Sequence, residues 1–313
     1  MSSHPPSAPY TPRDLHAEVT RKIVTALETG AATFSFPWRA ATSLPKNVVS
    51  GRPYRGVNTL LLWLIGEEHG YAAPHWATFR QWSALGHPVR KGEKAATVVF
   101  WKTRAPDEAA SQEDEDDPGR RRSILARAYH VFNGDQVDGF VAPAMPILAD
   151  RERDQRAEAF FAALPITVDH GGAEAFYRPS TDSVHLPPFA VFKDANGYYS
   201  TRGHESVHAT GAKHRLDRQM TTRFGSEAYA MEELVAELGA AFLCADLGLT
   251  PEPRPDHAGY IQSWLKVLKG DTRAIFTAAG QAQAAVDWLH TAVAAKNVVD
   301  GCVAALTSMG RTS

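Results

Sequence analysis

The chain has 313 residues, of which 44% are hydrophobic and 22% charged, and its formal net charge is −2. These proportions are ordinary for a globular protein, and the length suffices for two domains with cores of their own. No apolar run approaches the length of a bilayer, no secretory signal opens the chain, and only Cys244 and Cys302 are present. We therefore expect a cytoplasmic protein without membrane contact or a disulfide framework.

Two helices are expected in the first third of the chain. Over residues 14–28, apolar side chains such as Val19 and Leu27 recur at helical spacing, and Gly30 provides a stop. A second, mostly apolar helix is expected over 59–69, where it would belong to the core.

Two strands are expected on either side of an acidic insert. Residues 97–101 and 128–132 are rich in β-branched and aromatic side chains. Between them, residues 107–122 read DEAASQEDEDDPGRRR, a like-charge block with a Pro-Gly step and no hydrophobic period. We expect a solvated, flexible insert that connects two strands of one sheet.

Cations and aromatic rings alternate in the segments between these elements. Residues 1–105 hold 13 Lys and Arg against 6 Asp and Glu, a charge of +7, so the rest carries −9. This asymmetry favours contact with a polyanion, and the mixture of rings and cations suits a single nucleic-acid strand. Uneven surface charge and aromatic rings buried in a core are the structural alternatives. The candidate contacts are Trp38, Asn47, Tyr54, Arg55, Asn58, Trp76, Arg80, Lys91 and Lys94.

A further helix is expected at about 151–163. The most informative segment, HESVH, lies well beyond it at residues 204–208. On a helix, His204 and His208 would share one face and could bind one divalent metal, while Glu205 could act as a general base on a water molecule. A surface helix that carries a His-Glu-His stripe is the alternative.

A single-metal site of this kind needs a third protein ligand, and the chain offers two candidates. His214 completes the longer pattern H-E-x-x-H-x-x-G-x-x-H, in which Gly211 would turn the chain. Glu233 and Glu237 lie four residues apart beside the apolar stripe of a helix expected over 230–243, where a buried carboxylate needs a partner. The residues alone leave both routes open, together with an ordinary solvated acidic stripe.

The order of these segments resembles the ArdC family of antirestriction proteins. The resemblance covers most of the chain, and the acidic insert is its main departure. It is carried by 45–47 (PKN), 51–58 (GRPYRGVN), 76–81 (WATFRQ), 89–94 (VRKGEK), 131–136 (VFNGDQ), 198–208 (YYSTRGHESVH), 215–218 (RLDR), 224–230 (FGSEAYA) and 232–237 (EELVAE).

This resemblance implies an α+β fold with two domains. A small α+β domain that binds single-stranded DNA would occupy residues 8–141, and a mainly helical, zincin-like metallopeptidase domain would occupy 150–308. Because the helix with Glu233 recurs in similar sequences while the position of His214 varies, the resemblance implies Glu233 as the third ligand. Glu237 would then orient a histidine. The ion would be Zn²⁺ or another divalent metal such as Mn²⁺.

The implied function is protection of plasmid DNA that enters a cell by conjugation as a single strand. The partners would be that strand and a host restriction enzyme or another protein substrate, with Glu205 as the catalytic base. Two alternatives stay open. One is a non-catalytic protein that occludes single-stranded DNA and has a structural or vestigial metal site. The other is a regulatory metalloprotease that DNA brings to its target.

Overall fold

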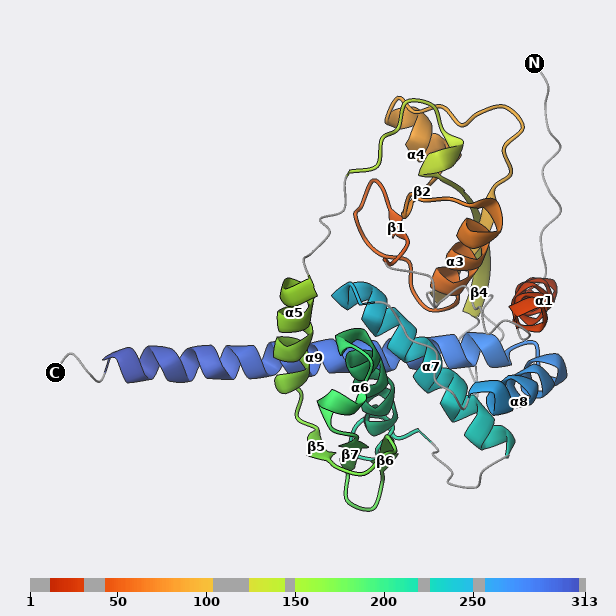
Figure 1. Ribbon diagram of the computed structural model, residues 1–313. Coiled ribbons are helices and arrows are strands. Elements are labelled where there is room, and N and C mark those ends of the chain that lie inside the picture. Colours follow the sequence, from red (N-terminus) through yellow and green to blue (C-terminus); the bar gives the residue numbers. More distant parts are fainter. Residues whose placement is uncertain are drawn as a thin grey trace, which may run out of the picture.

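The computed structural model describes residues 12–30, 43–103, 124–143, 150–218, 226–249 and 257–309, so Trp38 and the acidic insert lie outside the described residues. Figure 1 shows a small part built from strands β1–β4 with α3 and α4, and a larger, mainly helical part built around α6 and α7. The long helix α9 (Ala274–Met309) runs across the middle of the molecule in this view, with the smaller part above it and α6 and β5–β7 below it. This architecture confirms the expected α+β class.

The smaller part is built on a four-stranded sheet in the order β1-β2-β4-β3. Strand β1 is parallel to β2, and the other two pairs are antiparallel. The predicted strands are confirmed as β3 and β4, which pair from Ala96 opposite Val131 to Thr103 opposite Ile124. The strand bounds are Lys46–Asn47 (β1), His75–Thr78 (β2), Ala96–Thr103 (β3) and Ile124–Asn133 (β4), and a short 3₁₀ helix, Gly134–Gln136 (η2), follows.

Helix α3 (Val57–His69) closes the free edge of β3 through the Asn58 carboxamide. The Asn58 Oδ1 accepts a hydrogen bond from the backbone N of Val99 at 2.8 Å, and its Nδ2 donates to the Val99 carbonyl at 2.7 Å. One buried side chain therefore satisfies two edge-strand groups that would otherwise need another strand or water. Helix α4 (Phe79–Ala84) begins at a capping box between Thr78 and Gln81.

The larger part combines helices with a three-stranded sheet in the order β5-β7-β6. Helix α7 packs against α6, α8 and α9, so it lies at the centre of this part (Figure 1). The bounds are Asp150–Ala162 (α5), Thr167–His170 (β5), Phe176–Arg178 (β6), Ser183–Leu186 (β7), Phe189–Val191 (η3), Ala195–Thr210 (α6), Glu227–Leu247 (α7) and His257–Gly270 (α8).

The first helix, α1 (Pro12–Gly30), joins the two parts. It packs against α3 and against α8, and its Thr20 Oγ1 donates a hydrogen bond to the Thr272 carbonyl at 2.7 Å. Leu27 is fully buried in a core cluster that continues from α1 and α3 into α6–α9. Because this core spans both parts, the domain boundaries 8–141 and 150–308 remain a prediction.

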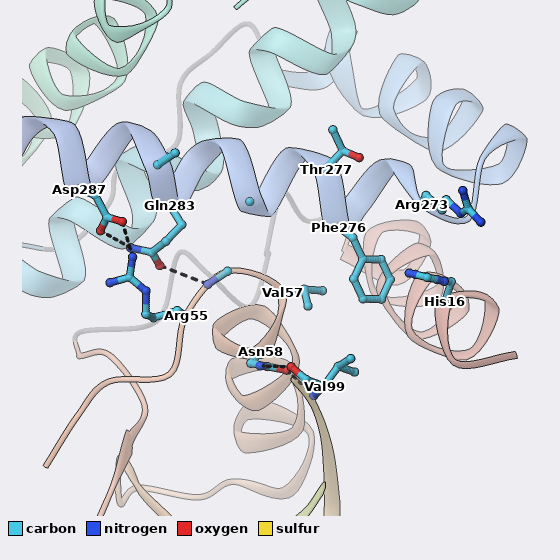
Figure 2. Close-up of a pocket in the computed structure, with 13 residues that line it drawn as sticks. His16, Arg55, Val57, Asn58, Val99, Arg273, Phe276, Thr277, Gln283 and Asp287 are labelled. Atoms are coloured by element: carbon cyan, nitrogen blue, oxygen red, sulfur yellow. Dashed lines mark hydrogen bonds and ion pairs between the residues drawn. The ribbon is translucent and has the colours of Figure 1, made fainter. Parts of the chain in front are cut away.

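A cavity of about 520 Å³ lies between the smaller part and α9. Figure 2 shows Arg55 reaching Asp287 there, while the Gln283 side chain accepts a hydrogen bond from the Gly56 backbone N at 3.2 Å. Gly56 has a φ of 56°, and a Cβ at this position would lie 3.6 Å from the Ala279 carbonyl oxygen. The space would accept a Cβ, so it is the positive φ, rarely adopted by other residues, that favours a glycine in the turn before α3.

The expected helices over 14–28, 59–69, 151–163 and 230–243 correspond to α1, α3, α5 and α7. Residues 196–201 form the first turns of α6, because Asp194 caps the helix upstream of them. Among the described residues, no helix is long and apolar enough to cross a membrane.

Candidate functional site

Helix α6 carries the H-E-x-x-H segment near its C-terminal end. Its first turn is stabilised by Asp194, whose Oδ1 accepts a hydrogen bond from the Gly197 N at 2.9 Å. Twelve of the sixteen residues of α6 are buried, among them His204 and Glu205. This burial contradicts the interpretation of a surface helix with a His-Glu-His stripe, since solvent does not surround these polar groups.

Close packing between α6 and α7 brings a glutamate to the two histidines. Gly239 of α7 lies against Val207 of α6, and a Cβ at this position would be 2.8 Å from the Val207 Cγ2. Only a glycine fits without a shift at this contact, which lies between the histidines and about two turns from Glu233 along α7. The helix pair is therefore close enough for short side chains to meet across it.

The three side chains of His204, His208 and Glu233 converge on one point. The Nε2 atoms of the two histidines are 3.1 Å apart, and the Glu233 carboxylate oxygens lie 3.5 Å from His204 Nε2 and 3.6 Å from His208 Nε2. Each of the three offers a ligand atom within 4.8 Å of the other two. Within the described ranges, no other set of three His, Cys, Asp or Glu side chains meets this criterion. Two imidazoles and a carboxylate form a donor set typical of zincin-like metal sites.

Glu232, which the sequence arguments missed, holds the other ring nitrogen of His208. Its Oε1 lies 3.1 Å from His208 Nδ1, so the ring is oriented with Nε2 toward Glu233. Arg218 clamps the same carboxylate from the far side, with Nε to Oε2 at 3.0 Å and Nη2 to Oε1 at 2.8 Å. Arg218 also donates to the Val207 carbonyl at 2.7 Å, which ties the carboxylate to α6. Hydrogen bonds of this kind fix the orientation of a ligating histidine.

The carboxylates around His208 determine its protonation. Burial alone would lower the pKa of His208, but the hydrogen bond to Glu232 and the charges of Glu233, Glu232 and Glu205 raise it above the ordinary value of 6.5. Burial likewise tends to raise the pKa of Glu232, and the hydrogen bonds from His208 and Arg218 hold it below its usual range. These carboxylates therefore favour a positive charge on His208.

Two further groups line the same cluster. The Glu237 carboxylate lies 3.9 Å from His204 Nδ1, on the side of the ring that faces away from Glu233. Tyr229, one turn before Glu233 on α7, places its hydroxyl 3.1 Å from that of Tyr260. Burial, the hydrogen bond with Tyr260 and the negative charge of Glu233 all raise the pKa of Tyr229, so its phenol stays a neutral hydrogen-bond donor.

His214 lies outside this cluster. Its side chain is 64% exposed, and its Nε2 is 3.4 Å from a carboxylate oxygen of Asp182 in the turn between β6 and β7. Arg215 holds the same carboxylate through both guanidinium nitrogens, at 2.7 and 2.9 Å. The chain after Gly211 thus turns toward the small sheet, and the structure does not bring His214 to the two histidines.

The candidate nucleic-acid contacts divide by burial. Trp76 is 2% exposed and packs with Tyr54 in a core cluster, and Asn58 is occupied by the edge of β3. The expectation that these three side chains contact a DNA strand directly is wrong, because each of them is buried within the fold. Asn47 is used in a turn, where its Oδ1 accepts hydrogen bonds from Val49 N and Ser50 N at 3.1 Å.

The four remaining candidates are cations on the surface. Arg55, Arg80, Lys91 and Lys94 are exposed, as phosphate contacts require. Arg55 is paired with Asp287, and it lines a different cavity from Lys94. The structure therefore keeps these cations accessible and places Arg55 and Lys94 at separate cavities.

Comparison with known proteins identifies both parts of the chain. Residues 13–132 match the model of the N-terminal domain of the anti-restriction factor ArdC, and residues 155–281 match a zincin-like metallopeptidase family. An uncharacterized protein of Sinorhizobium fredii, y4eC, is 53% identical over 288 residues, which cover 90% of this chain and 93% of that protein. The DNA primase TraC of Escherichia coli is 36% identical over 296 residues, but the chain spans only 27% of that protein.

Solved structures agree with this match over nearly their whole length. The metal-free crystal structure of the antirestriction protein ArdC from plasmid R388 is 41% identical, with a TM-score of 0.73 over 90% of this chain and 98% of that one. Its Mn(II)-bound structure gives the same TM-score and coverage at 39% identity. The chain therefore belongs to the ArdC family of antirestriction proteins.

Proposed function

We propose that this chain protects incoming plasmid DNA from host restriction, with a first domain that binds single-stranded DNA and a second that binds a divalent metal. The domains would extend over about 8–141 and 150–308. The observation that supports metal binding by the second domain is the convergence of His204, His208 and Glu233 across the α6–α7 contact. The proposed binding of single-stranded DNA by the first domain rests on the ArdC domain match and on the +7 charge of residues 1–105.

The three convergent side chains fit a divalent ion. Two imidazole nitrogens and one carboxylate oxygen suit Zn²⁺ and also Mn²⁺, and the Mn(II)-bound structure of a 39% identical relative supports a divalent metal. When bound, the ion would supply Lewis-acid chemistry, polarising a carbonyl and lowering the pKa of a water molecule. Glu237 supports this site from the far side of His204, as a positioning residue.

Peptide hydrolysis at this site would use the residues around the histidines. Glu205, which follows the first histidine and is 2% exposed, would take a proton from the attacking water on a carboxylate oxygen and pass it to the leaving nitrogen. Glu232 and Arg218 would hold His208 in position. The neutral Tyr229 hydroxyl could donate a hydrogen bond to the oxygen on which negative charge develops.

Substitution of Glu205 by Gln tests the enzymatic half of this proposal. The change removes the base and keeps the volume, so metal content and binding of single-stranded DNA should match wild type, while peptidase and antirestriction activities should fall by at least about 100-fold. Glu174→Gln, an exposed glutamate of the same part, is the matched control.

The outcomes of this experiment separate the candidate functions. If a Glu205→Gln protein that still holds its metal keeps full antirestriction activity, the chain acts as a non-catalytic protein that occludes single-stranded DNA and not as a peptidase. Cleavage of a cellular protein that single-stranded DNA stimulates would identify a DNA-localised regulatory protease. A wild-type chain that binds neither single-stranded DNA nor a divalent metal would overturn the proposal.

A further inference from the structure

Two large aromatic side chains lie side by side on the surface of the smaller part. Phe100 of β3 is 47% exposed and Tyr129 of β4 is 41% exposed. Their ring centroids are 5.4 Å apart, and the rings meet edge to face at 85°. Large apolar rings are usually buried, so an exposed pair in contact needs an explanation in terms of a partner.

The register of the sheet explains why the pair is exposed. Val98 is directly opposite Tyr129, and Phe100 is directly opposite Arg127, so all four side chains share one face. On this face Val98 is fully buried in a core cluster that includes Leu62 of α3, while Phe100, the next position on the face, is exposed. The pair therefore continues a core face beyond the point where α3 covers it.

The backbone that presents the pair is fixed. Val99, the residue before Phe100, has both its N–H and its carbonyl bonded to the Asn58 side chain, at 2.8 and 2.7 Å. A ring on such a backbone loses little conformational freedom when a ligand stacks on it. Asn58, expected to touch nucleic acid directly, instead holds the strand beside the exposed ring.

A cation lies next to the rings. Arg127 is exposed and is directly opposite Phe100 in the register. Within the described part of the chain its guanidinium has no carboxylate partner, in contrast to Arg55, Arg90 and Arg215. It is therefore available to an anionic group on a ligand that covers the rings.

We infer that Phe100, Tyr129 and Arg127 form a stacking platform for single-stranded DNA, with bases on the two rings and a phosphate at Arg127. The inference rests on the proposed binding of single-stranded DNA and names the surface responsible. Two neighbouring rings on a sheet face with an adjacent cation suit unpaired bases, which expose their flat faces, whereas bases in a duplex are stacked on each other. A single DNA strand offers flat base faces beside anionic phosphates, which complement the rings and the exposed Arg127 guanidinium, whereas an apolar protein groove offers no anionic group.

Binding of a fluorescent oligothymidylate, measured by anisotropy with the full chain, tests this surface. Phe100→Ala and Tyr129→Ala should each raise the Kd roughly 5- to 100-fold, whereas Tyr129→Phe should bind as wild type does because it keeps the ring. Arg127→Ala should reduce the dependence of log Kd on log salt by about one. Phe189→Ala removes a ring of similar exposure, 50%, from the other part and should leave the Kd unchanged.

Photo-crosslinking of bromodeoxyuridine-substituted DNA to the wild-type chain gives an answer that needs no variant to fold. Crosslinks at Phe100 or Tyr129 would support the platform, and crosslinks confined to other residues would overturn it. Wild-type affinity in both alanine variants would overturn it as well, while leaving the proposed binding of single-stranded DNA intact. A wild-type chain without affinity for the oligonucleotide would instead remove the proposed function, and the platform with it.

Discussion

Arg55 and Asp287 form an ion pair that links the smaller part to α9 across the cavity in Figure 2. Arg55 is also one of the exposed cations expected to meet a DNA phosphate. A strand that binds Arg55 must compete with the Asp287 carboxylate for it. Both side chains are about half exposed, at 57% and 47%, so the pair contributes only modestly to stability.

Removal of Asp287 should therefore strengthen DNA binding. Asp287→Ala should lower the Kd for single-stranded DNA roughly 2- to 5-fold and change the free energy of unfolding by less than about 1 kcal/mol. Anisotropy titrations and urea denaturation would measure the two effects. Asp300→Ala removes another exposed carboxylate of α9, which pairs with Lys296 of the same helix, and is the matched control. An affinity equal to that of the control variant would mean that Arg55 does not contact the strand.

The hydrogen bond between Glu232 and His208 predicts a loss of metal affinity in Glu232→Gln. The substitution weakens the acceptor that orients the ring, and such changes typically cost 10- to 100-fold in metal affinity, so calorimetry with Mn²⁺ should show a drop of about this size. Glu227→Gln alters a glutamate of the same helix that is 70% exposed and should bind Mn²⁺ normally. Equal affinities in the two variants would show that Glu232 does not position the ligand.

Asn58 should matter for stability and not for contact with DNA. In Asn58→Ala, the buried N–H and carbonyl of Val99 lose both partners, which should cost about 2–4 kcal/mol of unfolding free energy in urea titrations. Asn297→Ala, an exposed asparagine of α9, should be neutral within about 0.5 kcal/mol. If the Asn58→Ala protein is as stable as wild type but binds DNA more weakly, Asn58 contacts DNA directly.

The raised pKa of His208 predicts that metal binding weakens early on acidification. A ligating imidazole must be neutral, and protons compete for His208 at pH values already above 6.5. Calorimetry with Mn²⁺ from about pH 8 to about pH 5 should show the affinity falling before pH 6.5 is reached. Affinity that stays constant to below pH 6.5 would contradict the assigned environment of His208.

The metal-free protein should respond in the opposite sense. A pKa that is raised on folding contributes stability that is fully present below 6.5 and is lost as the pH rises through the folded value. Urea denaturation in the presence of a chelator should therefore show this contribution of His208 disappearing on the alkaline side, and Glu232→Gln should reduce it.

The sequence predicted α7 from its apolar period, which is a local property, but it did not place the start of α6, where Asp194 caps the helix. It could not decide between Glu233 and His214, since the choice depends on how closely α7 approaches α6, and Gly239 makes that contact possible only in three dimensions. Neighbouring residues of a helix point about 100° apart, so a pattern that placed Glu233 on the metal side gave no role to Glu232, which contacts His208 Nδ1 in the structure. The Arg218–Glu232 contact, which holds Glu232 against His208, joins residues that are 14 positions apart in the chain.

The proposed DNA surface was harder to predict, because long-range pairing decides which of its residues are exposed. Asn58 bonds to Val99, 41 positions away, so its side chain has a structural role and not the expected contact with nucleic acid. Trp76 and Tyr54 are enclosed by strands from both sides of the acidic insert. The exposed pair of Phe100 and Tyr129 becomes visible only once the register of β3 and β4 is known.

The central claim is that His204, His208 and Glu233 hold a divalent metal, and metal counting in two variants tests it most directly. Purified Glu233→Gln and His214→Ala proteins would be dialysed against Mn²⁺ or Zn²⁺, and bound metal would be measured by mass spectrometry, with circular dichroism to show that each is folded. We predict that Glu233→Gln loses most of its metal and His214→Ala retains about one ion per chain, because His214 pairs with Asp182 outside the cluster. Full occupancy in Glu233→Gln together with loss in His214→Ala would contradict the account.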